Sequence, residues 1–180
     1  MRAVSVQIFH GYGPNHTPFG LNTGDNTDPG DIFKGSGVRH ASIYGPQVCL
    51  LALAARAAIG SVESRMEPRR ALVTNGGPWA VDAALGFLRT SQERGPRFVN
   101  PLVFPATLVS AGAAAVGVVI GAGACAIAVG HDELAFFEML RRSQQFLCRG
   151  LAQEVIAAVA CAPSPALAIA LESAGLIAPA

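Results

Sequence analysis

The chain has 180 residues, of which 51% are hydrophobic and 14% are charged, with a formal net charge of +1. A chain of this length forms one domain or one half of a larger one, and its apolar composition predicts exposed patches that a partner covers. The near-neutral charge, with a single lysine and no basic cluster, argues against nucleic-acid binding, because phosphate contacts need a basic face.

The first 75 residues predict two strands, a helix and one long polar segment. Ala3–Phe9 is apolar and predicts an opening strand, whereas residues 10–40 are rich in Gly, Pro, Asn and Asp, which predicts a long loop. A helix is expected within Ile43–Ile59, regular from about Pro46, because proline is tolerated in a first helical turn. Arg70–Asn75 predicts a short strand that ends at a pair of glycines.

The middle of the chain predicts two helices and a strand. Pro78–Arg89 predicts a helix with proline at its start, and the following SQERGPRFVNP reads as a linker. Thr107–Ile120 is dominated by small residues, chiefly alanine, and predicts a helix that Gly121–Gly123 closes. Cys125–Val129 is apolar throughout and predicts a buried strand.

The last part of the chain predicts one amphipathic helix and two strands. Asp132 is a good N-cap for a helix over Glu133–Cys148, and Glu154–Cys161 and Ala166–Leu171 predict strands. Strands that alternate with helices indicate an α/β fold. We therefore expect residues 1–180 to form a single domain, a mixed sheet of about five strands covered by helices on both faces.

The sequence supports a membrane-spanning helix or disulfide bonds less well than it supports a folded α/β domain with free thiols. Ala111–Val129 carries no charge and is long enough to be considered as a membrane span, but it consists mostly of Ala and Gly and has no flanking Lys or Arg anchors. The N-terminus has no long apolar segment typical of a signal peptide. Because the cysteines lack a C-x-x-C spacing, we expect buried free thiols in a cytoplasmic protein, with no metal and no membrane contact. The cysteines are Cys49, Cys125, Cys148 and Cys161.

The stretch VVIGAGACA, Val118–Ala126, raises two rival functions. Its Gly-x-Gly-x-x-Ala spelling is that of a dinucleotide-binding loop, Gly121–Ala126, and Cys125 is a candidate nucleophile for a small acyltransferase. A dinucleotide loop needs a strand before its glycines and a helix after them, whereas the predicted order here is reversed. We interpret the stretch as a helix end, a turn and a strand, with Cys125 a buried structural thiol; the two rival functions remain alternatives.

Three segments carry a further signal: VNPLVFPATLVSAGAAAVGVVIGA (Val99–Ala122), QFLCRGLAQEVIAAVAC (Gln145–Cys161) and ALAIALESA (Ala166–Ala174). In this order they resemble the N-terminal half of the β-ketoacyl synthases, the condensing enzymes of fatty-acid and polyketide assembly. The first is similar to the family's Pro-x-x-x-Pro-x-Thr-Leu segment and small-residue helix. The others are similar to the Arg-Gly turn with its buried strand and to a closing strand that ends in Leu-Glu. The resemblance implies a truncated thiolase-like fold, a single half-domain, and it leaves residues 10–40 unmatched.

The resemblance also implies a position for the nucleophile. In the family, a cysteine at the start of a long central helix follows a buried strand, and a helix N-terminus stabilises a thiolate. Counting back from Arg149-Gly150 puts that position at Glu133, so the catalytic cysteine is replaced by glutamate. The family's condensation also uses two histidines from its C-terminal half, which the resemblance does not cover. We therefore expect no condensation by this chain alone, and no cofactor.

Chain-length factors are subunits of this kind, in which the cysteine is usually a glutamine. They pair with an active synthase and shape its acyl tunnel. The resemblance implies that the strand Cys125–Val129 pairs across the dimer axis, and that Phe104 lies at the bottom of the partner's tunnel with Thr107 as a polar contact. The expected partners are a complete ketosynthase subunit and, through the complex, an acyl carrier protein. The interface residues that it implies are Leu102, Val103, Phe104, Thr107, Ala126, Ile127, Ala128 and Val129.

Overall fold

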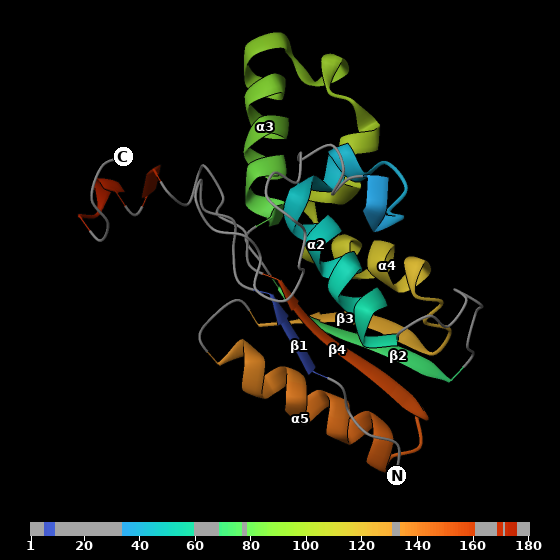
Figure 1. The fold of residues 1–180 in the computed structure, drawn as a ribbon. Helices are drawn as coiled ribbons and strands as arrows, with labels where there is room; N and C mark the ends of the chain where they lie inside the picture. Colours follow the sequence, from blue (N-terminus) through green and yellow to red (C-terminus); the bar gives the residue numbers. More distant parts are fainter. Residues whose placement is uncertain are drawn as a thin grey trace.

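The computed structural model describes residues 6–9, 34–59, 69–76, 79–130, 134–160, 169–170 and 172–175. Strands and helices alternate along this part of the chain (Figure 1). The strands are β1 (Val6–Phe9), β2 (Arg70–Asn75), β3 (Cys125–Val129) and β4 (Glu154–Ala160). The helices are α2 (Ala41–Ile59), α3 (Trp79–Arg94), α4 (Val109–Val119) and α5 (Ala135–Cys148), with 3-10 helices η1 (Pro96–Phe98) and η2 (Pro101–Thr107).

The strands form one sheet in the order β1-β4-β2-β3, and all three pairings are parallel. The α/β class is confirmed, but the expected mixed sheet of about five strands differs from the four parallel strands found among the described residues. A strand over Ala166–Leu171 is also wrong where it can be checked. Residues 169–170 and 172–173 are helical, and the amide of Ala174 donates to the carbonyl of Ala170 at 3.0 Å. A short apolar run fits a buried strand and a helical turn equally well.

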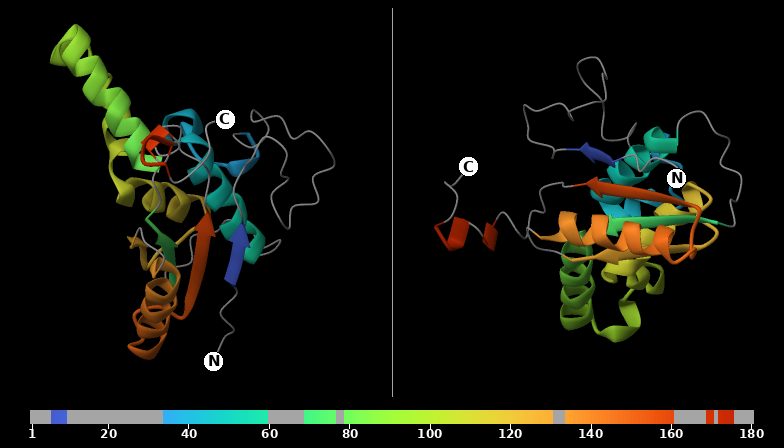
Figure 2. Two further views of the ribbon diagram at one scale, coloured as in Figure 1. Left: turned by 90° about the vertical axis from the view of Figure 1, so that its left-hand side faces the viewer. Right: turned by 90° about the horizontal axis from the view of Figure 1, so that it is seen from below.

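The two central strands, β2 and β4, are buried on both faces, as their apolar sequences predict, whereas the edge strand β3 is half-buried rather than buried as expected. α2 and α4 cover one face, and α5 covers the other (Figures 1 and 2). Alternate residues of β2 divide between these faces, because side chains along a strand point to opposite sides. Leu72 packs in the cluster under α2 and α4, whereas Ala71 and Val73 pack in the cluster over α5.

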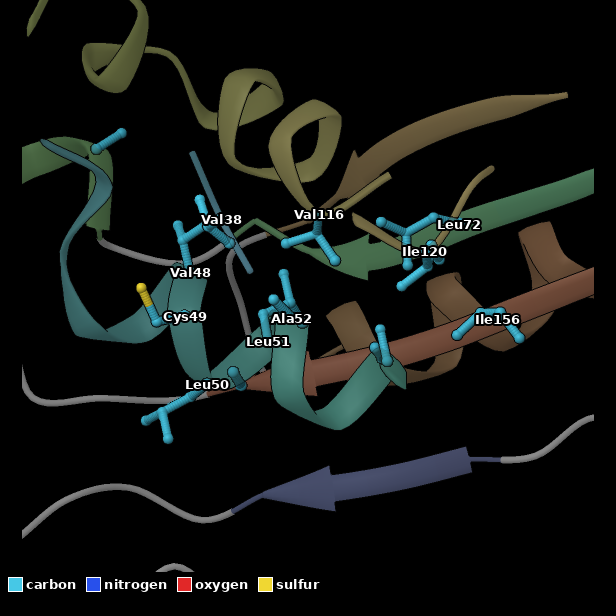
Figure 3. Close-up of a cluster of buried hydrophobic side chains, with 14 residues drawn as sticks. Val38, Val48, Cys49, Leu50, Leu51, Ala52, Leu72, Val116, Ile120 and Ile156 are labelled. Atoms are coloured by element: carbon cyan, nitrogen blue, oxygen red, sulfur yellow. The ribbon is translucent and has the colours of Figure 1, made fainter. Parts of the chain in front are cut away.

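The larger core lies between the sheet and α2. Figure 3 shows Leu51 of α2, Val116 and Ile120 at α4, and Leu72 of β2 converging in this layer, and each of the four is fully buried. α2 is regular from Pro46, as predicted. The turn before it is separated by Gly45, which has a non-helical φ of 79°. Burial of these large apolar side chains is the main source of stability for the sheet and its helices.

α2 is also the one described helix that is long and apolar enough, by length and composition, to cross a membrane. The pair formed by η2 and α4 passes the same test only if it is counted as one broken span, bent by 97°. Since the run from Gln47 to Ala52 is buried in the protein, a core position accounts for the composition of α2.

Residues 111–129 form a helix end and a strand, as predicted for this uncharged stretch, although the strand is half-buried rather than buried. α4 ends at Val119, Gly121 adopts a φ of 65°, and β3 begins at Cys125. α4 approaches β3 so closely that a Cβ atom added to Gly117 would lie 2.7 Å from the Cβ atom of Ala126. Small residues in this helix therefore serve close packing on the edge strand.

α3, η1 and η2 form an arm, residues 79–107, that stands clear of the sheet (Figures 1 and 2). The predicted linker after Arg89 is wrong, because α3 continues to Arg94 and two 3-10 helices follow. Asn100 caps η2, since its side chain accepts a hydrogen bond from the amide of Leu102. Phe87 of α3 packs on Phe104 of η2, with ring centroids 5.8 Å apart, and holds the two sides of the arm together.

Most of the predicted loop 10–40 lies outside the described residues. Its last part, residues 34–40, contains a helical turn at 34–36 and is held against the core. Ser36 and Val38 are buried, and the hydroxyl of Ser36 accepts a hydrogen bond from the amide of Val38 at 3.2 Å. This end of the segment therefore belongs to the folded domain.

Candidate functional site

Cys125 lies at the amino end of β3 and is a poor candidate for a nucleophile. Its half-buried side chain packs against the apolar cluster that contains Val73 and Met139. Burial raises the pKa of the Cys125 thiol, so that the reactive thiolate is scarce at neutral pH. α5 begins beyond the opposite end of this strand. The geometry therefore favours a structural role for Cys125, although the side chain is half-buried rather than fully buried as expected.

The loop Gly121–Ala126 does not have the arrangement of a dinucleotide site. The helix α4 precedes its glycines, and the strand β3 follows them. Two of its amides also donate within the chain: that of Ala122 donates to Gly117 O at 2.8 Å, and that of Ala124 donates to Arg70 O at 2.9 Å. A phosphate-binding loop instead needs free amides at the start of a helix.

The side chain of Arg70 also holds the turn that follows α4 in place through hydrogen bonds. Its buried guanidinium donates to the carbonyl of Ile120 and to the carboxylate of Glu154, each at 2.7 Å. The C-terminus of α4, the start of β2 and the start of β4 are thereby joined by one side chain. A buried charge is tolerated here because it is both paired and hydrogen-bonded.

Glu133, the position that the resemblance gives to the nucleophile, lies outside the described residues, as does His131. β3 ends at Val129 and α5 begins at Ala135, so the residues between them connect the carboxyl end of a strand to the N-terminus of a helix. In parallel sheets, this edge is where ligands usually bind.

The carboxyl edge of the sheet holds a polar network that the sequence did not reveal. The side chain of Gln47, which is 3% exposed, donates to the carbonyl of Ala160 at 2.9 Å. The amide group of Asn75 donates to the same carbonyl at 3.1 Å and accepts from the amide of Ala160 at 3.3 Å. These neutral side chains join α2, β2 and β4. In the sequence, the one feature that could have indicated this network was a glutamine within an otherwise apolar helix.

The edge strand β3 supplies half of the predicted interface. It pairs with β2 alone among the described strands, so its other backbone edge has no strand beside it. Ala126 packs toward α4, and Ile127 and Val129 join the cluster over α5. All five residues of the strand, Ala128 included, are half-buried. β3 therefore offers a partner its backbone amides and carbonyls more than its side chains.

The arm contains the other half of the predicted interface residues. Leu102 is 64% exposed and Phe104 is 53% exposed, whereas Val103 between them is half-buried. The hydroxyl of Thr107 donates to the carbonyl of Phe104 at 2.7 Å, so it supports the turn of η2 instead of standing free for a partner. α4 packs against both η2 and β3 and lies between these two surfaces in the fold.

The described cysteines are in three different environments. Cys49 is buried and Cys125 is half-buried, but Cys148 is exposed, which contradicts the expectation that all are buried. Burial raises the pKa of Cys49, and a hydrogen bond with Ser36 partly opposes that rise. Cys161 lies outside the described residues. Within the part of the chain that the structure describes, no three His, Cys, Asp or Glu side chains gather as metal ligands would.

Comparisons with known proteins leave the function to be argued from the site itself. No family model matches the chain, and no curated protein is significantly similar to it. The resemblance to the β-ketoacyl synthases stays a prediction.

Proposed function

We propose that the chain is a non-catalytic subunit resembling a chain-length factor, which pairs with a complete ketosynthase and helps to shape its acyl tunnel. The observation that carries the proposal is the arm, because η2 exposes Leu102 and Phe104 at the segment that the resemblance assigns to the partner's pocket. Large exposed apolar side chains on a rigid element are typical of a protein–protein contact.

The position of β3 at the end of the sheet, as far as the described strands go, supports the same proposal. A strand whose outer edge is unpaired can add to a sheet of another chain through backbone hydrogen bonds. β3 lies at the end of the sheet, and its side chains already pack inside this chain. Pairing would give hydrogen-bond partners to the backbone amides and carbonyls on the outer edge of β3 without disturbing the core. We propose that the partner's equivalent strand lies beside β3.

The proposed contribution to the tunnel comes from Phe104. One side of its ring rests on Phe87, which fixes its position, and about half of the side chain remains exposed. A ring held in this way can close the end of a narrow apolar channel. The fatty or polyketide chain grown by the partner would then stop where it meets the ring, with an acyl carrier protein serving the complex.

The proposal assigns no condensation to this chain. Glu133 stands where the resemblance expects the nucleophile. A carboxylate there would be stabilised by the helix dipole, but it would form only a labile anhydride with an acyl group. The half-buried Cys125 has a raised pKa and lies at the other end of the strand. We expect the complex to work in the cytoplasm.

Native mass spectrometry tests the pairing. The chain is expressed alone and together with a complete condensing enzyme from the same genome. We expect a stable complex with equal numbers of the two subunits. A chain that is soluble and monomeric alone and forms no complex with any such synthase would overturn the proposal.

A matched pair of phenylalanine variants tests the tunnel. Phe104→Ala should lengthen the products of the complex, because it removes the ring that ends the channel. Phe137→Ala removes a ring from α5 that is somewhat more exposed, 65% against 53%, and should leave product length unchanged. Product chains are measured by mass spectrometry. Identical products from the wild type and both variants would contradict the role of Phe104.

A further inference from the structure

Phe104 is held by two kinds of contact that come from different parts of the arm. Its backbone carbonyl accepts a hydrogen bond from the hydroxyl of Thr107 at 2.7 Å, within η2. Its ring instead packs on Phe87 of α3, with ring centroids 5.8 Å apart and ring planes inclined by 58°. Inclined rings at this separation attract each other, because the positive edge of one ring approaches the negative face of the other. The backbone of Phe104 is therefore held by η2, and its ring is held by α3.

The hydrogen bonds of η2 do not involve Phe87. The carbonyl of Asn100 accepts from the amide of Val103 at 3.1 Å, and the side chain of Asn100 caps the start of the helix. Loss of the Phe87 ring would leave these bonds in place, but it would remove the aromatic surface on which the Phe104 ring lies. Because about half of the Phe104 side chain is already exposed, its ring would then move among several rotamers.

We infer that Phe87 is a second determinant of product length, a positioning residue that acts through Phe104. This inference rests on the proposed function, in which the ring of Phe104 ends the acyl channel. A ring stops growing chains at one length only if it stays in one place, and Phe87 packs against it there. Phe87 belongs to α3, outside the segment that the resemblance assigns to the partner's pocket. Its effect on the product is therefore indirect.

Removal of the Phe87 ring has an effect of defined direction. A small residue at this position lets the ring of Phe104 turn back toward α3, which deepens the end of the channel. A ring that moves among several positions also stops growing chains at several lengths. Phe87→Ala should therefore give products that are longer on average and more varied in length than those of the wild type, with a smaller shift than Phe104→Ala gives.

Mass spectrometry of the products of the complex tests the effect on length. Phe87→Tyr keeps the aromatic ring and should give wild-type products, as should Leu88→Ala, the control at the next residue of α3, which is 54% exposed. The double variant Phe87→Ala with Phe104→Ala should give the same products as Phe104→Ala alone, because Phe87 acts through Phe104. Wild-type products from Phe87→Ala, where Phe104→Ala lengthens them, would overturn the inference and leave the proposed function standing. A further shift in the double variant would do the same.

Fluorine NMR of the chain alone tests the positioning without a synthase. A para-fluorophenylalanine in place of Phe104 reports the surroundings of that ring. We expect its resonance to be displaced from that of the free amino acid by the neighbouring ring, and Phe87→Ala should move it to the free value, whereas Leu88→Ala should not. If Phe87→Ala fails to fold, Phe87→Leu, which keeps an apolar side chain without a ring, takes its place.

The two measurements separate the inference from the proposed function. A resonance that is unchanged when the Phe87 ring is removed would overturn the inference, whether or not the complex forms. Failure of the chain to bind any synthase, or wild-type products from Phe104→Ala, would overturn the proposed function and with it the role of Phe87 in product length, even if the resonance moves as expected.

Discussion

The sheet with its covering helices and the arm differ in how far their large apolar side chains are exposed to solvent. Around the sheet, Leu51, Leu72 and Ile120 are enclosed by residues of the same chain. On the arm, Leu85, Leu102 and Phe104 are about half exposed or more. Because burial of a large apolar side chain stabilises a protein by about 1.5–3 kcal/mol, a chain that leaves several exposed gains stability when another chain covers them. The first region accounts for the fold, and the second is the surface that the proposed association uses.

The largest expected effect compares two leucines. Leu51→Ala should lower the free energy of unfolding by about 3 kcal/mol, because it leaves a cavity in a fully buried site. Leu85→Ala should change it by about 0.5 kcal/mol or less in the monomer, because that side chain is already half in water. Urea denaturation of dilute protein measures both. An equal loss in the two variants would mean that the arm is part of the core.

The next effect compares two glycines in helices. Gly117→Ala should cost about 1–3 kcal/mol, since the new methyl group would lie 2.7 Å from the Cβ atom of Ala126. Gly86→Ala on α3 meets nothing within 4 Å and should stabilise the protein by about 0.5–1 kcal/mol, because alanine favours the helix. Thermal unfolding measures the difference. If both variants were stabilised, the close packing of α4 on β3 would be wrong.

The smallest effect compares two thiols. Iodoacetamide at pH 7 should modify Cys125 about tenfold more slowly than the exposed Cys148, because burial raises the pKa of Cys125 and lowers its thiolate fraction. The rate at Cys125 should rise with pH through and above the ordinary value of 9.0, as the thiol loses its proton. Peptide mass spectrometry follows each site. Faster labelling of Cys125 would restore the acyltransferase alternative.

Local patterns predicted most elements within the described residues. Arg70–Asn75 and Cys125–Val129 were predicted with the bounds that β2 and β3 have, because each is a short apolar run between glycines or polar residues. The order of helix, glycine turn and strand over 109–129 was predicted for the same reason. η2 was missed because the segment up to its first residue, Pro101, was read as a linker, although proline is compatible with the first turn of a helix.

The candidate site was predicted less completely. Leu102 and Phe104 were named from a resemblance, and their exposure agrees with a contact surface. The exposure of Val81, Leu85 and Leu88 on α3 was missed, because apolar residues at helical spacing give the same pattern whether or not their own chain buries them. The Gln47–Ala160 hydrogen bond was missed because it joins residues 113 positions apart.

The sequence by itself determined the α/β class, the burial of the central strands β2 and β4 and the identity of the residue, Glu133, at the position that the resemblance gives to the nucleophile. These follow from local periodicity, apolar content and residue identity. Only the tertiary structure decided the strand order, the edge position of β3 among the described strands, the half-buried rather than buried state of Cys125 and the projection of the arm. Those features depend on which distant segments pack together, and no local pattern records such a choice.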